Sequence, residues 1–193
     1  MPFLHNSKHP AEYGKSLARD LGCSDDDSEL LVKCLQSKDP KKIIEHSQKF
    51  ATFDHIPEPF IPVVDNWLNE PVLPQPLDQV WANIENIRIP LMIGGNKDEG
   101  VLFIVQFLKN GDLYKRVNEN FSTELPALLL GVDPDDAAKD EGETATAETL
   151  RNSYLPGDGQ MSSEVVQQMI RLFTDVHFLS PIDQVRGGEN LFV

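Results

Sequence analysis

Two neighbouring carboxylates, Asp98 and Glu99, lie in a short polar loop that follows an apolar run from Ile89 to Ile93. The run has the length of a strand and is closed by Gly94 and Gly95, a pattern that favours a strand buried on both faces of a largely parallel sheet. Functional side chains collect at the carboxyl ends of such strands, where a carboxylate can orient a histidine that acts as a general base. From spacing alone, an ordinary strand-to-helix loop with an acidic helix start is the alternative.

The segments around this loop predict an α/β fold that is mostly helical, with two or three strands of a larger, mainly parallel sheet. The predicted helices are 10–21, one beginning near 24–27 and running through 35, one after Pro40, 116–130 and 161–179. The predicted strands are 59–65, 89–95 and the beginning of one at 191–193, and the acidic stretch 133–148 predicts a solvated loop or a polar helix start. Because parallel strands need neighbours on both sides, we expect residues 1–193 to be a fragment of one larger domain.

Five separate segments carry a resemblance to a known family. They are LARDLGC at 17–23, SELLVKCLQSKDPKKII at 28–44, PFIPVVD at 59–65, IPLMIGGNKDEGVLF at 89–103 and FTDVHFLSPID at 173–183. Their order over nearly the whole chain resembles the type B carboxylesterase and cholinesterase family of α/β-hydrolases, and insect carboxylesterases in particular. The resemblance implies that the chain comes from the interior to the C-terminal half of one such domain.

The resemblance also implies which catalytic residue the chain contains. In the family, the Glu of the N-K-D-E-G loop is the acid of a Ser-His-Glu triad, and the matching residue is Glu99, with Asp98 only its neighbour. The family's nucleophile lies in a G-x-S-x-G elbow, which occurs nowhere in this sequence. The family's catalytic His follows the strand that begins at Leu191, and His177 is expected to be a packed or partly exposed helix residue. We therefore expect this chain alone to be inactive.

A disulfide and a secretory compartment follow from the same resemblance. Cys23 and Cys34 have ten residues between them, the spacing of a small-loop disulfide in cholinesterase-like proteins. Two unpaired cysteines facing a core are the alternative. A disulfide implies an oxidising compartment, and the N-glycosylation triplet that begins at Asn120 fits that compartment. We expect the parent protein to be a secreted or extracellular glycoprotein.

The segment before the first predicted strand bears on substrate choice. In cholinesterases the matching stretch carries aromatic residues that line the acyl pocket. The positions here hold Ile56, Glu58 and Phe60, so the aromatic pattern is only partly present. The resemblance thus implies a pocket unlike that of an acetylcholine-specific enzyme, with a surface position in a loop as the alternative for Glu58.

Composition excludes several classes of partner. Lys and Arg number 17 against 31 Asp and Glu, a net charge of −14 that argues against nucleic acid or an anionic membrane surface. No apolar run approaches the length of a membrane span, and the residues after Met1 do not form a signal peptide, so we expect an internal start. The five histidines do not pair with Cys or carboxylates at zinc-site spacing, so neither a metal site nor a cofactor is expected. No feature indicates an oligomeric state.

Two functions are compatible with these observations. The first is a serine esterase that hydrolyses a small-molecule ester, to which this chain supplies Glu99. The second is a non-catalytic adhesion or binding protein that kept the cholinesterase-like fold. The acidic loop departs from N-K-D-E-G in adhesion members such as neuroligins, and it is intact here, which favours the esterase.

Overall fold

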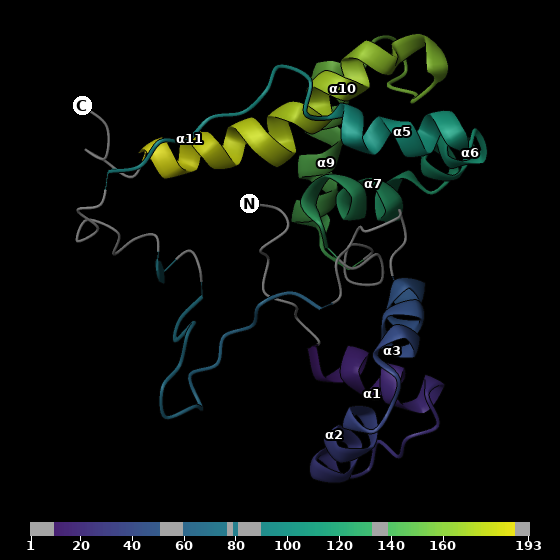
Figure 1. The fold of residues 1–193 in the computed structure, drawn as a ribbon. Helices are drawn as coiled ribbons and strands as arrows, with labels where there is room; N and C mark the ends of the chain where they lie inside the picture. The colour runs from purple at the N-terminus through teal and green to yellow at the C-terminus, as the bar shows by residue number, and fades with distance from the viewer. Residues whose placement is uncertain (1–9, 51–59, 77–78, 81–89, 133–138, 188–193) are drawn as a thin grey trace.

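A computed structural model describes residues 10–50, 60–76, 79–80, 90–132 and 139–187. Across these ranges the regular secondary structure is helical (Figure 1). The α-helices are α1 (Pro10–Asp20), α2 (Ser28–Gln36), α3 (Pro40–Ser47), α5 (Val101–Lys109), α6 (Asp112–Glu119), α7 (Phe121–Leu130), α9 (Glu141–Tyr154), α10 (Val166–Thr174) and α11 (Ser180–Gly187). Two short 3₁₀ turns, η2 (Gln48–Phe50) and η4 (Ser163–Val165), and a π-helix, η5 (Asp175–Leu179), complete the elements.

Capping residues in the sequence define the start of α2, the start of α3 and the end of α1. The Asp27 side chain accepts a hydrogen bond from the backbone N–H of Leu30 at 2.9 Å and caps α2, while Asp39 accepts from Lys41 N at 2.9 Å and caps α3. After α1, Gly22 adopts a left-handed conformation with φ 72°, as a helix-ending glycine does. The three N-terminal helix predictions are confirmed.

A disulfide joins Cys23, which follows α1, to Cys34 in α2, with 5.9 Å between the two Cα atoms. The predicted pairing is confirmed. Because α2 contributes no fully buried side chain, this covalent bond is a main connection between α2 and α1.

Replacing both cysteines by alanine is expected to lower the free energy of unfolding by about 2 to 3 kcal/mol, since the bond closes a short loop. Urea denaturation of the Cys23→Ala/Cys34→Ala variant measures this loss. Wild type treated with a reductant serves as the control and should lose a similar amount. Equal stability of the variant and the oxidised wild type would show that the bond does not stabilise the fold.

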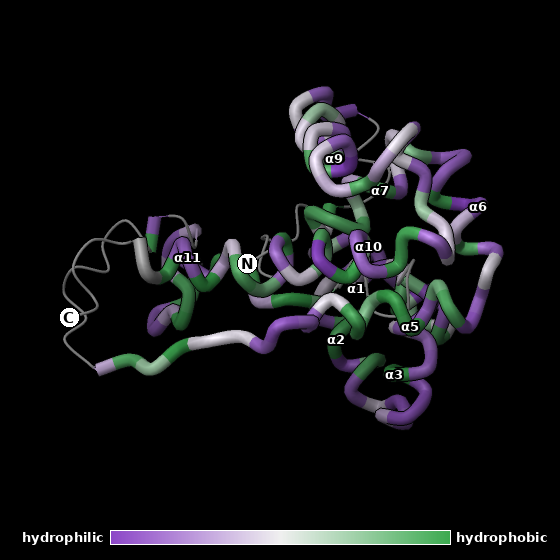
Figure 2. The backbone as a smooth tube through the Cα atoms, turned by 90° about the horizontal axis from the view of Figure 1, so that it is seen from above, coloured by the Kyte–Doolittle hydropathy of each residue, from purple (hydrophilic) through white to green (hydrophobic). Residues whose placement is uncertain are grey.

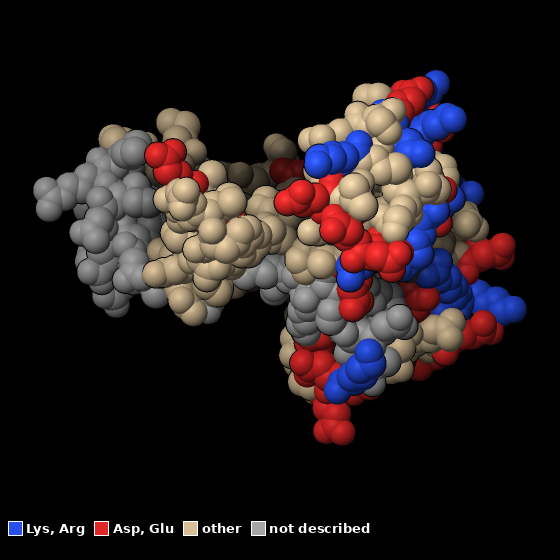
Figure 3. Space-filling view, turned by 90° about the horizontal axis from the view of Figure 1, so that it is seen from below, with Lys and Arg blue, Asp and Glu red and all other residues tan. Residues whose placement is uncertain are grey.

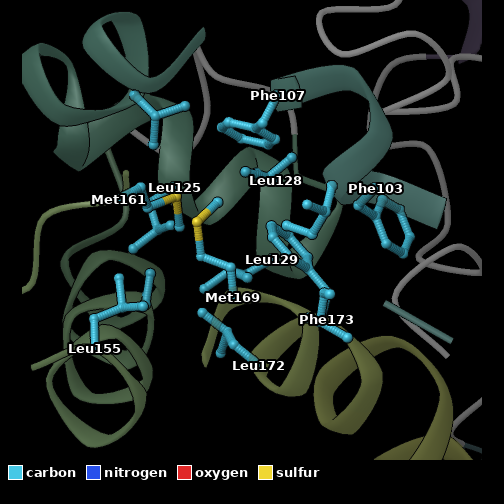
Figure 4. Close-up of a cluster of buried hydrophobic side chains, with 14 residues drawn as sticks. Phe103, Phe107, Leu125, Leu128, Leu129, Leu155, Met161, Met169, Leu172 and Phe173 are labelled. Atoms are coloured by element: carbon cyan, nitrogen blue, oxygen red, sulfur yellow. The ribbon is translucent and has the colours of Figure 1, made fainter. Parts of the chain in front are cut away.

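The hydrophobic core lies among α5, α6, α7, α9 and α10 (Figure 4). Phe103 of α5 stacks on Phe173 of α10 with 5.2 Å between ring centroids. At the other end of the core, the Arg116 guanidinium donates to both carboxylate oxygens of Glu124 at 2.8 and 3.0 Å and ties α6 to α7. Fully buried members of the core include Ile104, Phe107, Val117, Leu125, Leu128, Leu129, Ala147, Met161, Met169, Leu172 and Phe173.

The single helix predicted at 116–130 is two helices that meet at Asn120, so this prediction is wrong in its continuity. Asn120 has φ −114° and ψ 40°, a conformation outside the helix. Within α7, Pro126 lacks the N–H that would bond to the carbonyl of Ser122. The Thr144 hydroxyl of α9 donates to that carbonyl instead, at 3.4 Å, and helps to hold α9 against α7.

The long helix predicted at 161–179 is confirmed from Ser163 onward, because its helical turns follow one another without a gap. It consists of η4, α10 and η5, and α11 then continues directly from η5. The acidic stretch at 133–148 ends as a polar helix start, because Asp140 caps α9 through the N–H groups of Gly142 and Glu143. Residues 133–138 lie outside the described ranges.

Residues 59–65 and 89–95 were predicted as strands, but their described parts, 60–65 and 90–95, form no strand. A strand exists through hydrogen bonds to a neighbouring strand, and the described ranges provide no such neighbour. Met92 is 99% exposed and Leu91 is 47% exposed, so the middle of the second segment is open to solvent. Residues 191–193 lie outside the described ranges, so the third predicted strand is untested.

Residues 90–95 run beside α11 before the chain turns into α5 (Figure 1). A β-carbon on Gly95 would lie 3.3 Å from Ile182 Cδ1 and 3.5 Å from Leu179 Cδ2, which brings this segment next to α11. Figure 2 shows the apolar residues of the segment, the polar loop at 96–99, and the apolar beginning of α5 in succession. Over the described ranges, no helix is both long and apolar enough to cross a membrane.

Candidate functional site

Glu99 lies in the turn that connects the extended segment to α5. Its Oε1 accepts two hydrogen bonds from Asn96, one from the backbone N–H at 2.9 Å and one from the side-chain Nδ2 at 2.7 Å. The backbone of the turn is closed by Val101 N to Asp98 O and by Leu102 N to Glu99 O, each at 3.1 Å. Glu99 is half-buried, whereas its neighbour Asp98 is exposed. The two carboxylates of the loop therefore have different surroundings, and the fixed one is Glu99.

Gly100 joins this loop to α10. Its N–H donates to the Thr174 hydroxyl at 2.9 Å, and that hydroxyl donates to the carbonyl of Ile170 at 2.7 Å. A β-carbon at position 100 would lie 2.1 Å from the Ile170 carbonyl oxygen and 2.8 Å from Thr174 N. The backbone thus touches α10 directly, and only glycine fits at this point.

Thr174 is a residue that the sequence analysis missed. It is 1% exposed and bonds across the fold to a residue 74 positions earlier. A hydroxyl directly after the apolar residues Leu172 and Phe173 is the signal that could have suggested it, since a buried hydroxyl needs a partner.

His177 is packed in the π-helix η5, which confirms the expectation for this residue. It is 4% exposed, and its ring stacks on Phe103 with 4.4 Å between centroids and on Phe173 with 5.8 Å. Its Nε2 lies 3.0 Å from the carbonyl oxygen of Leu128, and because a carbonyl only accepts, Nε2 carries the proton. Burial lowers the pKa of His177 to about 4, although the bond to Leu128 acts in the opposite direction. The imidazole is therefore neutral at physiological pH.

This pKa predicts how stability depends on pH. In the unfolded chain His177 has a pKa near 6.5, so between pH 6.5 and about 4 the unfolded state binds the extra proton. The stabilisation is complete above pH 6.5 and is lost as pH falls towards 4, by about 3 kcal/mol in total. Urea midpoints measured across this range should fall less steeply in His177→Phe than in wild type. An equal slope in His177→Phe and wild type would contradict the assignment.

The predicted pocket residues are only partly described. Ile56 and Glu58 lie outside the described ranges. Phe60 is 47% exposed and forms an edge-to-face cluster with Tyr13 and Phe50, at 6.3 and 6.0 Å between ring centroids. The structure thus places Phe60 against α1 and η2, and no described contact connects it to Glu99.

Asn120, the predicted glycosylation site, lies at the exposed junction of α6 and α7. Its Nδ2 donates to the carbonyl of Arg116 at 3.1 Å. The side chain of Phe121, the middle residue of the triplet, is covered by the Arg151 guanidinium, 3.5 Å from the ring centroid. In this triplet Asn120 is exposed, and the ring of Phe121 beside it is held in place by Arg151.

A concavity of about 360 Å³ lies between α7, α9, η5 and α11. The Tyr154 hydroxyl donates to Asp175 Oδ2 at 2.7 Å in its wall. Burial and this hydrogen bond raise the pKa of Tyr154 to about 12, so the phenol stays neutral at physiological pH. The remaining lining residues are Leu129, Leu130, Thr146, Leu150, Val176, Ser180, Pro181 and Gln184. The concavity holds a carboxylate–phenol pair and differs in chemistry from the loop of Glu99.

Charge is distributed unevenly over the surface. Figure 3 shows acidic and basic side chains gathered over the helical body, while the side towards α11 is mostly uncharged. Over the described ranges, no group of three or more His, Cys, Asp or Glu side chains lies close enough together to hold a metal ion.

The site consists of a half-buried glutamate in a turn that Gly100 anchors to α10, next to a mostly helical body. Comparison with known sequences shows the class of protein to which the chain belongs. The model of the carboxylesterase family matches residues 1–187, so the chain belongs to this family. The α/β-hydrolase fold follows from that membership.

Three relatives indicate the range of the family that this chain resembles. It is 27% identical to a carboxylic ester hydrolase of Bombus ignitus over 166 residues, which are 84% of this chain and 29% of the relative. Identity to Esterase FE4 of Myzus persicae is 28% over 181 residues, 91% of this chain and 30% of the relative. Identity to Neuroligin-2 of Rattus norvegicus is 25% over 173 residues, 89% of this chain and 19% of the relative. The chain therefore spans less than a third of the length of each.

Proposed function

We propose that this chain supplies Glu99 as the acid of a Ser-His-Glu triad in a carboxylesterase that hydrolyses a small-molecule carboxylic ester. The observation that carries the proposal is the fixed Glu99 carboxylate, which Asn96 holds at Oε1 in a loop anchored to α10. The serine and the histidine would come from polypeptide outside these 193 residues. The ester hydrolase and esterase names of two insect relatives support this reaction class.

The roles of the three residues follow from the chemistry of nucleophilic catalysis. The serine oxygen attacks the ester carbonyl while the histidine takes its proton. The Glu99 carboxylate orients the imidazole and stabilises its charged form. Backbone N–H groups elsewhere in the domain would stabilise the oxyanion. On its own, this chain has one of the three triad groups and is expected to be inactive.

A second candidate function is a non-catalytic binding or adhesion protein, which the match to Neuroligin-2 supports. Such a protein could keep the fold without the nucleophile. The intact Asn96–Gly100 loop favours the esterase, because its contacts hold a carboxylate in place. A G-x-S-x-G elbow in the parent polypeptide would support the enzyme, and its replacement would support the binding protein.

Further features of the parent protein are proposed on the same basis. Ile56, Glu58 and Phe60 would contribute to the acyl side of the substrate pocket. The Cys23–Cys34 disulfide supports folding in an oxidising compartment, where the exposed Asn120 would carry an N-linked glycan. The parent would then be secreted or extracellular.

An assay of the 193-residue chain with an aryl ester tests the assignment of roles. We expect no turnover above the buffer rate, because the nucleophile and the base are not among its residues. The Glu99→Gln form of the same chain should give the same background. Turnover by the chain that disappears in Glu99→Gln would show that its own residues form a complete site.

A further inference from the structure

We infer that Asn96 and Thr174 are positioning residues for Glu99, and that Asn96 occupies Oε1 so that Oε2 faces the histidine of the triad. The inference rests on the proposed role of Glu99 and deepens it. It assigns separate tasks to the two oxygens of one carboxylate.

The geometry at Asn96 carries the first part. The backbone N–H and the side-chain Nδ2 of Asn96 both donate to Glu99 Oε1, at 2.9 and 2.7 Å. A carboxylate oxygen has two lone pairs, so these two donors occupy both acceptor sites of Oε1. The acceptor sites of Oε2 can then serve the histidine. Hydrogen bonds to an ionised carboxylate are among the stronger ones in proteins, which suits a group whose direction must be fixed.

Helix capping does not explain these bonds. The first bond has the spacing of a capping box, in which a glutamate accepts from the backbone N–H three residues earlier. Here, however, Asn96 and Glu99 both precede α5, whose N-cap is Gly100. The second bond, from the Asn96 side chain, is not part of that motif, so Asn96 holds one oxygen of Glu99 at two points.

Thr174 carries the second part. Its buried hydroxyl accepts from Gly100 N at 2.9 Å and donates to Ile170 O at 2.7 Å, so its direction is fixed from both sides. Gly100 follows Glu99 directly, and its backbone touches α10. The Thr174 hydroxyl therefore fixes the position of the loop on α10, and with it the position of Glu99.

Kinetics of the full esterase polypeptide that contains this chain test the inference. Asn96→Ala removes the Nδ2 donor and Thr174→Val removes the anchor. Each should lower kcat by about 10- to 100-fold, because a misplacement of about 1 Å at a catalytic group can cost about 100-fold. KM should change by less than about twofold, since neither residue binds the substrate. Lys97→Ala, at an exposed position in the same loop, is the matched control and should keep wild-type kcat.

The pH profile separates positioning from a general loss of structure. A well-placed carboxylate raises the pKa of the imidazole beside it, so displacement of Glu99 should move the acidic limb of kcat/KM to lower pH. The other titratable groups on the loop and on the packed helices, Lys97, Asp98, Arg171, Asp175 and His177, are the same in both variants. A merely structural defect would lower the amount of active enzyme and leave the limb in place.

Two further measurements distinguish a loss of positioning from misfolding of a variant. Thr174→Ser retains the hydroxyl and should restore kcat to within about threefold of wild type even where Thr174→Val folds poorly. In the 193-residue chain, Glu99→Ala should speed hydrogen exchange at the Asn96 amide, which tests the contact without any activity. Full activity of Glu99→Gln would overturn the proposed function itself. Loss of activity in Glu99→Gln, with wild-type kcat and pH profile in Asn96→Ala, would overturn the inference alone.

Discussion

Gly100→Ala is expected to lose at least about 3 kcal/mol of stability, the upper part of the range for overpacked sites. The added β-carbon would lie 2.1 Å from the Ile170 carbonyl oxygen and 2.8 Å from Thr174 N, and both are backbone atoms of α10. No side-chain rotation can relieve such a contact. The loop must therefore move away from α10 and give up the bond from Gly100 N to Thr174.

Gly94→Ala is the matched control for this variant. Gly94 precedes the same loop, and a β-carbon there would meet nothing within 4 Å. Urea denaturation should show a large loss for Gly100→Ala and a small change for Gly94→Ala. Equal midpoints for the two variants would mean that the loop does not rest on α10 as described.

The second large effect is expected at Glu99. Glutamine has nearly the same shape and keeps an oxygen that can accept the two bonds from Asn96. It lacks the negative charge, and its amide N–H₂ would donate where Oε2 should accept, which favours the wrong imidazole tautomer. In serine hydrolases this type of change lowers kcat by about 10⁴-fold with the geometry intact.

Asp98→Asn is the matched control. Asp98 is the adjacent carboxylate of the same loop and is exposed, whereas Glu99 is half-buried and held by Asn96. Removing its charge should change kcat by less than about threefold, because exposed charges are strongly screened by solvent. Both Glu99→Gln and Asp98→Asn replace a carboxylate by an amide, so a difference between them reports the position of the carboxylate in the loop.

Local features of the sequence were enough to predict the N-terminal helices. Asp27 and Asp39 are capping residues that bond within three positions, and Gly22 ends α1 through its own backbone conformation. Such interactions involve near neighbours in the chain, so their outcome does not depend on the rest of the fold. The disulfide came from the family resemblance, because spacing alone left two free cysteines as an alternative.

The anchoring of the candidate site could not be predicted in the same way. Gly100 and Thr174 are 74 positions apart, and no local pattern connects them. The break at Asn120 was also missed, because apolar residues continue at helical spacing through both α6 and α7. The strands were predicted from apolar runs, yet a strand forms only beside a partner, and the described ranges supply none.

The position of Glu99 was predicted, whereas its surroundings were not. The apolar run, the two glycines and the acidic pair located the loop in the sequence. Resemblance to the family then separated Glu99 from Asp98, and the structure adds a physical difference between them, the two bonds from Asn96. The catalytic role of Glu99 is a proposal, and enzyme kinetics of Glu99 variants test it.

The most direct measurement is kcat/KM for an aryl ester with the full esterase polypeptide and its Glu99→Gln and Asp98→Asn variants at neutral pH. A loss of about 10⁴-fold in Glu99→Gln, with less than about threefold in Asp98→Asn, is the result expected for the triad acid. Circular dichroism should show that both variants keep the wild-type helix content. A folded Glu99→Gln enzyme with wild-type kcat/KM, or an equal loss in Asp98→Asn, would contradict the assignment of Glu99.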